Sequence, residues 1–285
     1  MRVGRIPYVN CYPVYGAIDR GVVPLAAEII DGVPTALNTQ MASGSLDVSV
    51  ISAVEYARDA QRYLLLPDLA ISCDGPVRSV MLFAKRPASE LAGRRVLVSR
   101  SSMTSVALLE LLFESVWDAK PTFVRSDAEL TDMARFGEEE HDARLVIGDA
   151  ALRLSAHLQD PSERDRMLDG FGYRYAYDLG AEWKRWTDLP FVFAVWVAQR
   201  TTDTRAALDV HASLIASRNW GLKHLDTLAA QAALATGVSR AHCLTYLSDL
   251  DYGLSYGHLA GLTEFFRRLV AAGRVPDGSL SFIAA

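Results

Sequence analysis

Two stretches of this chain share one pattern: DVSVISAVE at residues 47–55 and RLVIGDAAL at residues 144–152. Each begins with a continuous apolar run, typical of a strand covered on both faces, and passes through small polar residues into a helical pattern. In an open α/β sheet such a turn lies at the carboxyl end of the strand, where ligands bind. One turn in each half of the chain therefore predicts two lobes that face each other across a ligand-binding cleft.

The rest of the chain alternates short β-rich runs with amphipathic segments, which indicates an α/β fold with two mainly parallel sheets flanked by helices. The predicted strands cover residues 2–6, 26–30, 48–51, 80–84, 95–98, 122–124, 144–147 and 191–197. Helices are predicted over residues 34–43, 104–117, 206–217, 222–236, 240–248 and 259–272. Because the last four follow one another with glycines between them, we expect a helical C-terminal part.

The chain has 285 residues, which exceeds the usual size of a single core and favours two domains. Proline and charged residues lie next to predicted strands at residues 85–87 and 188–190, where we expect the connections between the lobes. We predict that lobe 1 comprises residues 1–84 and 190–285 and that residues 85–189 are inserted as lobe 2.

Composition excludes several classes of partner. A net charge of -5 gives no reason to expect binding to nucleic acid or to an anionic membrane. No apolar run approaches the ~18 residues that span a bilayer, and no secretory signal is visible at the N-terminus. With three cysteines at distant positions, which we expect to be reduced, the sequence predicts a cytoplasmic protein. Composition leaves the choice between monomer and homodimer open.

The sequence predicts neither a metal nor a cofactor. Its six histidines are scattered without an HxxxH or HxH pair. The motifs GxSxG, GxGxxG and GxxxxGK[ST] are all missing, which argues against an esterase elbow and against nucleotide binding. Catalysis, if present, must then be acid–base chemistry or an elimination on an activated substrate.

Two candidate groups follow the predicted strands near the expected cleft. Asn10 comes after the first strand, beside Tyr8, and its amide could hydrogen-bond a carboxylate or hydroxyl; a turn asparagine satisfied by its own backbone is the alternative. Ser79 opens the strand at 80–84 and is a possible hydrogen-bond donor. The guanidinium group of Arg78, next to it, could bind both oxygens of a carboxylate. A solvent-exposed arginine without a binding role is the commoner case.

A serine-rich turn precedes the predicted helix at 104–117. Its hydroxyl residues, with the free N–H groups of the helix start, can form an anion site without a lysine. Simple N-capping by one of them is the alternative, and both roles can hold at once. The hydroxyl residues of this turn are Ser101, Ser102, Thr104 and Ser105.

Three further residues complete the candidates. Asp149 ends a buried-looking strand and could transfer a proton, bind a hydroxyl or cap a helix. Ser52 occupies the corresponding turn of the first half. Trp186, in the second connection, could stack on a planar ring or serve only in packing. Residue chemistry alone predicts a small anion, such as a carboxylate, in a cleft.

Six motifs occur along the chain in the order in which one family has them. They are GRIPYVNCYPVY at 4–15, GSLDV at 44–48, CDGPVRS at 73–79, SSMTS at 101–105, LVIGDAAL at 145–152 and DLGAEWKRWTDLPFVFAVW at 178–196. Together they resemble the chorismate dehydratases of the futalosine route to menaquinone, over nearly the whole chain. The last motif and the DGPV turn are specific in combination, whereas the serine-rich turn alone is a weak signal.

The resemblance implies a bilobal type II periplasmic-binding-protein-like fold used as a cytoplasmic enzyme. The implied reaction is cofactor-free loss of water from chorismate to give 3-(1-carboxyvinyloxy)benzoate. Asn10 and Ser79 match residues regarded as belonging to the active site of that family, and the turn at 101–105 would take a substrate carboxylate. Since an amide is not a conventional base, we hypothesise that the base is a substrate carboxylate or Asp149.

Two other functions are compatible with the same shape. One is 1,4-dihydroxy-6-naphthoate synthase of the same pathway, which matches less well at the DGPV turn and in the motif at 178–196. The other is a non-enzymatic protein that binds small carboxylates. That function would require export, for which the sequence gives no signal.

Overall fold

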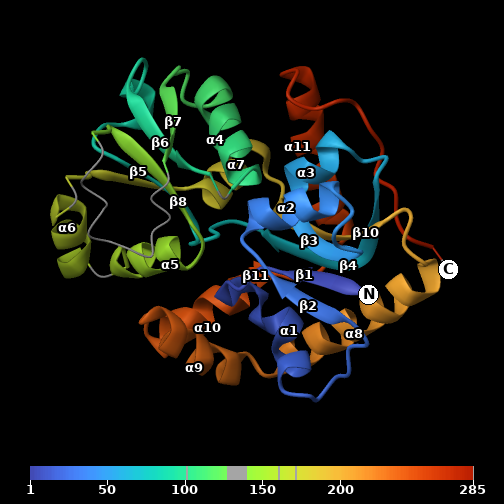
Figure 1. The fold of residues 1–285 in the computed structure, drawn as a ribbon. Coiled ribbons are helices and arrows are strands. Elements are labelled where there is room, and N and C mark those ends of the chain that lie inside the picture. The colour runs from blue at the N-terminus through green and yellow to red at the C-terminus, as the bar shows by residue number, and fades with distance from the viewer. Residues whose placement is uncertain (101, 127–139, 160, 171, 285) are drawn as a thin grey trace.

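The computed structural model describes residues 1–284 except 101, 127–139, 160 and 171. Its strands form two separate sheets with helices around them (Figure 1). The first sheet contains β1 (Arg2–Arg5), β2 (Glu28–Asp31), β3 (Val48–Ser52), β4 (Tyr63–Cys73), β10 (Phe191–Gln199) and β11 (Leu250–Asp251). The second contains β5 (Val80–Ala84), β6 (Arg95–Ser99), β7 (Thr122–Ser126), β8 (Ala143–Ile147) and β9 (Tyr175–Asp178). The predicted α/β class is confirmed.

Both sheets are mixed, so the prediction of mainly parallel sheets is wrong in this respect. The order is β11-β4-β10-β3-β1-β2 in the first sheet and β7-β6-β8-β5-β9 in the second. The parallel pairs are β1 with β2 and β3, and β6 with β7 and β8. The chain leaves the first sheet along β4 and returns along β10, and enters the second along β5 and leaves along β9. Strands used in opposite directions in this way pair antiparallel.

Sheet membership bears on the division into lobes. The chain changes sheet between Cys73 and Val80 and returns between Asp178 and Phe191. β5 pairs with β8 and β9, and it therefore belongs to the second sheet. We propose that the first boundary precedes Val80 instead of following residue 84, while the second lies near residue 189 as the sequence suggests.

Helices surround both sheets within the described part of the chain. They are α1 (Tyr12–Asp19), α2 (Pro34–Ala42), α3 (Ala53–Arg58), α4 (Thr104–Ser115), α5 (Gly148–His157), α6 (Pro161–Gly170), α7 (Leu179–Thr187), α8 (Thr204–Lys223), α9 (Leu225–Thr236), α10 (Arg240–Asp249) and α11 (Tyr256–Ala271), with short 3-10 helices η1 (Val9–Cys11) and η2 (Ala88–Glu90). The last four form the helical C-terminal part that the sequence predicts. None of the described helices is long and apolar enough to cross a membrane.

The first sheet is built around β10. All nine residues of this strand are buried, and it lies between β3 and β4. β4 was not predicted, because Pro67 and Asp68 interrupt its apolar pattern. In the structure the ladder between β4 and β10 is irregular there: Val197 pairs with Leu65 and Val195 with Ala70. Four residues of β4 thus bulge opposite a single residue of β10, and the bulge accommodates the proline.

Candidate active site

A cavity of about 80 Å³ brings most of the predicted site residues together. It is lined from both sheets by Ile6, Tyr8, Asn10, Pro34, Ser52, Ile71, Val77, Ser79, Val80, Ser102, Met103, Thr104, Ser105, Ile147, Gly148, Phe193 and Ala194. Several of these residues follow the carboxyl ends of strands β1, β3 and β8, as expected for a ligand site in an α/β fold. None of these lining residues is charged, so the cavity offers hydrogen bonds and apolar surface only.

Asn10 contributes the most unusual polar atom of the cavity. It lies in η1, the short helix that follows β1. Its Oδ1 atom is buried and, within the described part of the chain, has no hydrogen-bond donor. A buried acceptor without a partner costs about 1–3 kcal/mol, so such atoms are rare unless a ligand satisfies them. Asn10 is thus ready to accept a hydrogen bond from a bound molecule.

Ser79 is buried at the start of β5, and the chain before it is held by one carboxylate. Asp178 accepts hydrogen bonds from the backbone N–H of Val77 at 2.9 Å and of Arg78 at 2.6 Å. The same side chain caps α7 by accepting from the N–H of Ala181. Burial raises the pKa of Asp178, although these hydrogen bonds act in the opposite direction. These hydrogen bonds fix the turn that carries Ser79, whose hydroxyl donates to the Val77 carbonyl at 3.3 Å.

Ser52 is positioned by a residue that sequence reasoning missed. Asn38, buried in α2, donates from Nδ2 to Ser52 Oγ at 2.8 Å and accepts from the Ser52 N–H at 3.1 Å. Its Nδ2 also lies 3.0 Å from the sulfur of Met103, in the other lobe. An asparagine inside a predicted helix gives little sign of this role, since only the fold places it against β3.

The start of α4 meets the first lobe across the cavity. The Oγ atom of Ser102 accepts a hydrogen bond from the N–H of Ser105 at 3.3 Å, so Ser102 satisfies one of the first N–H groups of the helix, although Met103 holds the N-cap position. Thr104 Oγ1 accepts at 3.3 Å from the N–H of Val54, in the first turn of α3. Hydroxyls and helix-start amides thus gather where the sequence predicts an anion site. Ser101 lies outside the described residues.

Asp149 lies beside the cavity and is not among the residues that line it. Its Oδ1 atom accepts a hydrogen bond from the N–H of Val9 at 3.2 Å and so joins α5 to η1. Burial raises the pKa of Asp149. The preceding Gly148 has a φ of 64°, and a Cβ atom there would lie 3.1 Å from the ring of Tyr8. Glycine is required at this position, since the ring covers a left-handed turn.

Two predicted binding residues point elsewhere. Arg78 has a φ of 59°, and its guanidinium group pairs with Asp249 of α10 at 2.5 Å, outside the cavity. Trp186 is covered by the guanidinium group of Arg268, 3.7 Å from the ring centroid, and packs edge-on against Trp183. Both side chains therefore hold the C-terminal helices against the segments that connect the lobes. Neither side chain lines the cavity.

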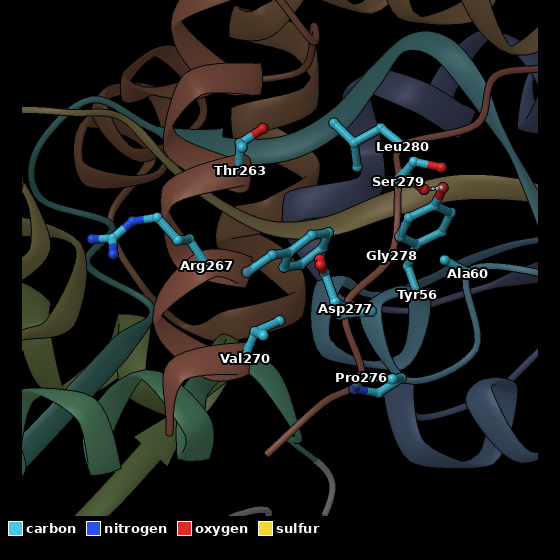
Figure 2. Close-up of a pocket in the computed structure, with 12 residues that line it drawn as sticks. Tyr56, Ala60, Thr263, Arg267, Val270, Pro276, Asp277, Gly278, Ser279 and Leu280 are labelled. Atoms are coloured by element: carbon cyan, nitrogen blue, oxygen red, sulfur yellow. Dashed lines mark hydrogen bonds between the residues drawn. The ribbon is translucent and has the colours of Figure 1, made fainter. Parts of the chain in front are cut away.

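A larger cavity of about 410 Å³ lies between α3, α11 and the C-terminal segment (Figure 2). Of the predicted site residues that the structure describes, none lines it. Two of its polar side chains have partners. The Tyr56 hydroxyl donates to the Ser279 carbonyl at 3.2 Å and accepts from the Ser281 N–H at 2.8 Å. Arg267 is bound by both oxygens of Glu264. In this Tyr56 cavity the Tyr56 hydroxyl is therefore fully engaged within the protein.

Comparisons with known proteins agree with this geometry. A crystal structure of an Archaeoglobus fulgidus protein superposes with a TM-score of 0.76 at 20% identity, covering 96% of this chain and 98% of that one. A Candida albicans protein with the generic periplasmic binding protein fold has a TM-score of 0.65 at 12% identity, covering 100% of this chain and 97% of its own. These similarities confirm the predicted fold.

Sequence relatives identify the family. The chorismate dehydratase of Thermus thermophilus is 33% identical over 272 residues, which are 92% of this chain and 95% of that protein. A family model described as menaquinone biosynthesis matches residues 1–271. The resemblance seen in the six motifs is thus confirmed, and the chain belongs to this menaquinone biosynthesis family.

Proposed function

We propose that this protein is a cytoplasmic chorismate dehydratase. The relatives of the chain and its family support this function, and one feature of the site carries it: Asn10, whose buried Oδ1 atom has no donor among the described residues, lines a neutral cavity together with Ser79. Chorismate carries a ring hydroxyl that can donate to this acceptor. The apolar part of the lining, including Phe193 and Ile147, suits the six-membered ring.

The reaction needs little from the protein beyond orientation and proton transfer. The C3–H bond and the C4–O bond of chorismate break, water leaves, and the ring becomes aromatic, so the driving force lies in the substrate. In our proposal Asn10 accepts a hydrogen bond from the C4 hydroxyl and orients it. Ser79 donates a hydrogen bond to the same oxygen as negative charge develops there.

The remaining polar residues bind the substrate in this proposal. The start of α4, with Ser102, Thr104 and Ser105, takes one carboxylate through its hydroxyls and backbone N–H groups. Ser52, held by Asn38, and the ring of Tyr8 close the opposite side. No charged side chain is among the described residues that line the cavity, so in this proposal neutral donors satisfy both substrate carboxylates.

A substrate carboxylate is the base that the geometry favours. Asp149 is not among the lining residues, and one of its oxygens is engaged by the N–H of Val9. A carboxylate of chorismate, by contrast, is carried into the cavity with the proton that must be removed. Asp149 then joins α5 to η1 and positions Asn10.

The direct test is to incubate the pure protein with chorismate in the presence of a metal chelator and to follow the aromatic product by chromatography. We expect stoichiometric formation of 3-(1-carboxyvinyloxy)benzoate, and we expect it to be lost in Asn10→Leu and Ser79→Ala. Tight binding of chorismate without turnover would instead favour a binding protein. Neither binding nor turnover would reject both functions.

A further inference from the structure

Four arginines gather in a second pocket next to the active-site cavity. This arginine pocket has a volume of about 380 Å³. It is lined by Thr35, Val54, Arg58, Ser99, Arg100, Ser102, Met103, Val106, Ala107, Glu110, Arg125, Leu269 and Arg274. Ser102 and Met103 also line the active-site cavity, so the two spaces share a wall.

The arginines come from four distant parts of the chain. Arg58 ends α3, Arg100 follows β6, Arg125 lies in β7, and Arg274 follows α11. α3, α4 and α11 contact one another where the two lobes face each other (Figure 1). Residues of both lobes therefore build the pocket.

Positive charge in this pocket is only partly neutralised. Arg274 is engaged by Glu110 at 3.2 Å and by Glu114 at 2.5 Å, and Arg100 has interactions of its own. Arg58 and Arg125 are exposed and make no ion pair or side-chain hydrogen bond with any described residue. The charge of Arg58 acts on Glu55 and that of Arg125 on Glu110, but neither guanidinium group is held by a direct contact with a described residue, although the protein as a whole has a net charge of -5.

If the active-site cavity binds a dianion, positive charge close to it would favour binding. Its described lining is uncharged, and moving two carboxylates from water into a neutral cavity carries a large desolvation cost. Positive charge at the adjoining wall raises the local concentration of an anion and offsets part of this cost. Arginine is suited to this role because its planar fork matches a carboxylate or phosphate group.

We propose that the arginine pocket binds a small oxyanion, through Arg58 and Arg125, and captures the dicarboxylate substrate at the edge of the active-site cavity. The binding of an oxyanion is independent of the reaction that the enzyme catalyses, whereas the capture of substrate rests on the proposed function. The two statements are tested separately.

The first test measures binding of inorganic phosphate to the full chain by titration calorimetry at low ionic strength. Variants are Arg58→Gln, Arg125→Gln and the double variant. Arg205→Gln is the matched control, since Arg205 is an exposed arginine of α8 that lines neither pocket. We expect about a tenfold weaker phosphate affinity in the double variant and no change in the control. Equal affinities in both, or no binding by the wild type, would overturn the site.

The second test is steady-state turnover of chorismate at low and high ionic strength. We expect the double variant to raise KM about tenfold at low salt without lowering kcat. The difference should nearly vanish near 1 M salt, where the Debye length is about 3 Å. A KM equal to that of Arg205→Gln would reject capture even if phosphate binds. If the wild type does not turn over chorismate, the proposed function fails, and the phosphate titration still decides the anion site.

Discussion

The active-site cavity and the Tyr56 cavity differ in a way that size does not reveal. The Tyr56 cavity is the larger, at about 410 Å³ against about 80 Å³. Its Tyr56 hydroxyl has both a donor and an acceptor within the protein. Asn10, which lines the smaller cavity, has a buried Oδ1 atom to which no described protein group donates a hydrogen bond. The buried acceptor of Asn10, more than the volume of the cavity, therefore favours the smaller cavity as the ligand site.

The two cavities also differ in what builds them. Residues of both lobes, many of them at strand ends, line the active-site cavity, whereas the Tyr56 cavity lies between α3, α11 and the C-terminal segment (Figures 1 and 2). Movement of one lobe against the other would open the first and leave the second nearly unchanged. Each of the following changes tests this contrast.

The largest effect is expected for Asn10→Leu. The substitution removes the orienting acceptor, so we expect kcat to fall by about 100-fold or more. It also removes an unsatisfied buried group, and the free energy of unfolding should therefore stay the same or rise by up to about 1 kcal/mol. Turnover and urea unfolding measure the two quantities. A variant that loses stability together with activity would show that Asn10 has a structural role.

Asn38→Leu should come next. It leaves the N–H of Ser52 without its acceptor, and we expect a loss of about 2 kcal/mol in the free energy of unfolding. We also expect kcat/KM to fall about tenfold, because the Ser52 hydroxyl loses its donor. Ser52→Ala alone and the double variant complete a thermodynamic cycle. Strictly additive losses in kcat/KM would contradict the claim that Asn38 acts through Ser52.

Tyr56→Phe is the counterpart of Asn10→Leu in the other cavity. It removes two hydrogen bonds to the C-terminal segment, so we expect the free energy of unfolding to fall by about 1–2 kcal/mol. Steady-state kinetics with chorismate should be unchanged. A drop in kcat comparable to that of Asn10→Leu would mean that the Tyr56 cavity participates in turnover and that the contrast is wrong.

For Asp149→Asn we expect kcat to fall by at most a few-fold, since an amide oxygen can still accept from the N–H of Val9. Burial raises the pKa of Asp149, so the folded state holds its proton more tightly than the unfolded state does. Wild-type stability should then fall as pH rises from the unfolded pKa through the raised folded pKa. The variant lacks this dependence.

Urea unfolding of both proteins between mildly acidic and neutral pH measures this difference. The stability of Asp149→Asn relative to the wild type should grow towards neutral pH. A loss of two orders of magnitude in kcat would assign the base to Asp149 and reject the substrate carboxylate.

The sequence predicted those strands and helices whose burial in the fold matches their own pattern of apolar and polar residues. The apolar runs at β3 and β8 and the helical C-terminal part were recognised because they are buried or amphipathic throughout. β4 was missed, since the bulge that tolerates Pro67 depends on its pairing with β10, more than a hundred residues later. For the same reason the antiparallel return strands, and with them the mixed sheets, could not be seen in the pattern of single segments.

The sequence predicted which turns form the candidate site, but it did not predict where each side chain of those turns points. Asn10, Ser52 and Ser79 lie at strand ends that the topology brings together, so their type and position sufficed. The directions of Arg78 and Trp186 are decided by Asp249 and Arg268, which lie on helices far along the chain. No local signal encodes such partners, and the same holds for the support that Asn38 gives to Ser52.

The place of β10 in the first sheet has a consequence for synthesis of the protein. β3 and β4 do not pair with each other, because β10 lies between them. A growing chain must therefore produce the whole inserted lobe before its first lobe can complete its sheet. Until residues 191–199 leave the ribosome, the apolar edges of β3 and β4 stay open to other chains. We expect the nascent protein to depend on chaperones during this interval, and chains truncated before β10 to aggregate.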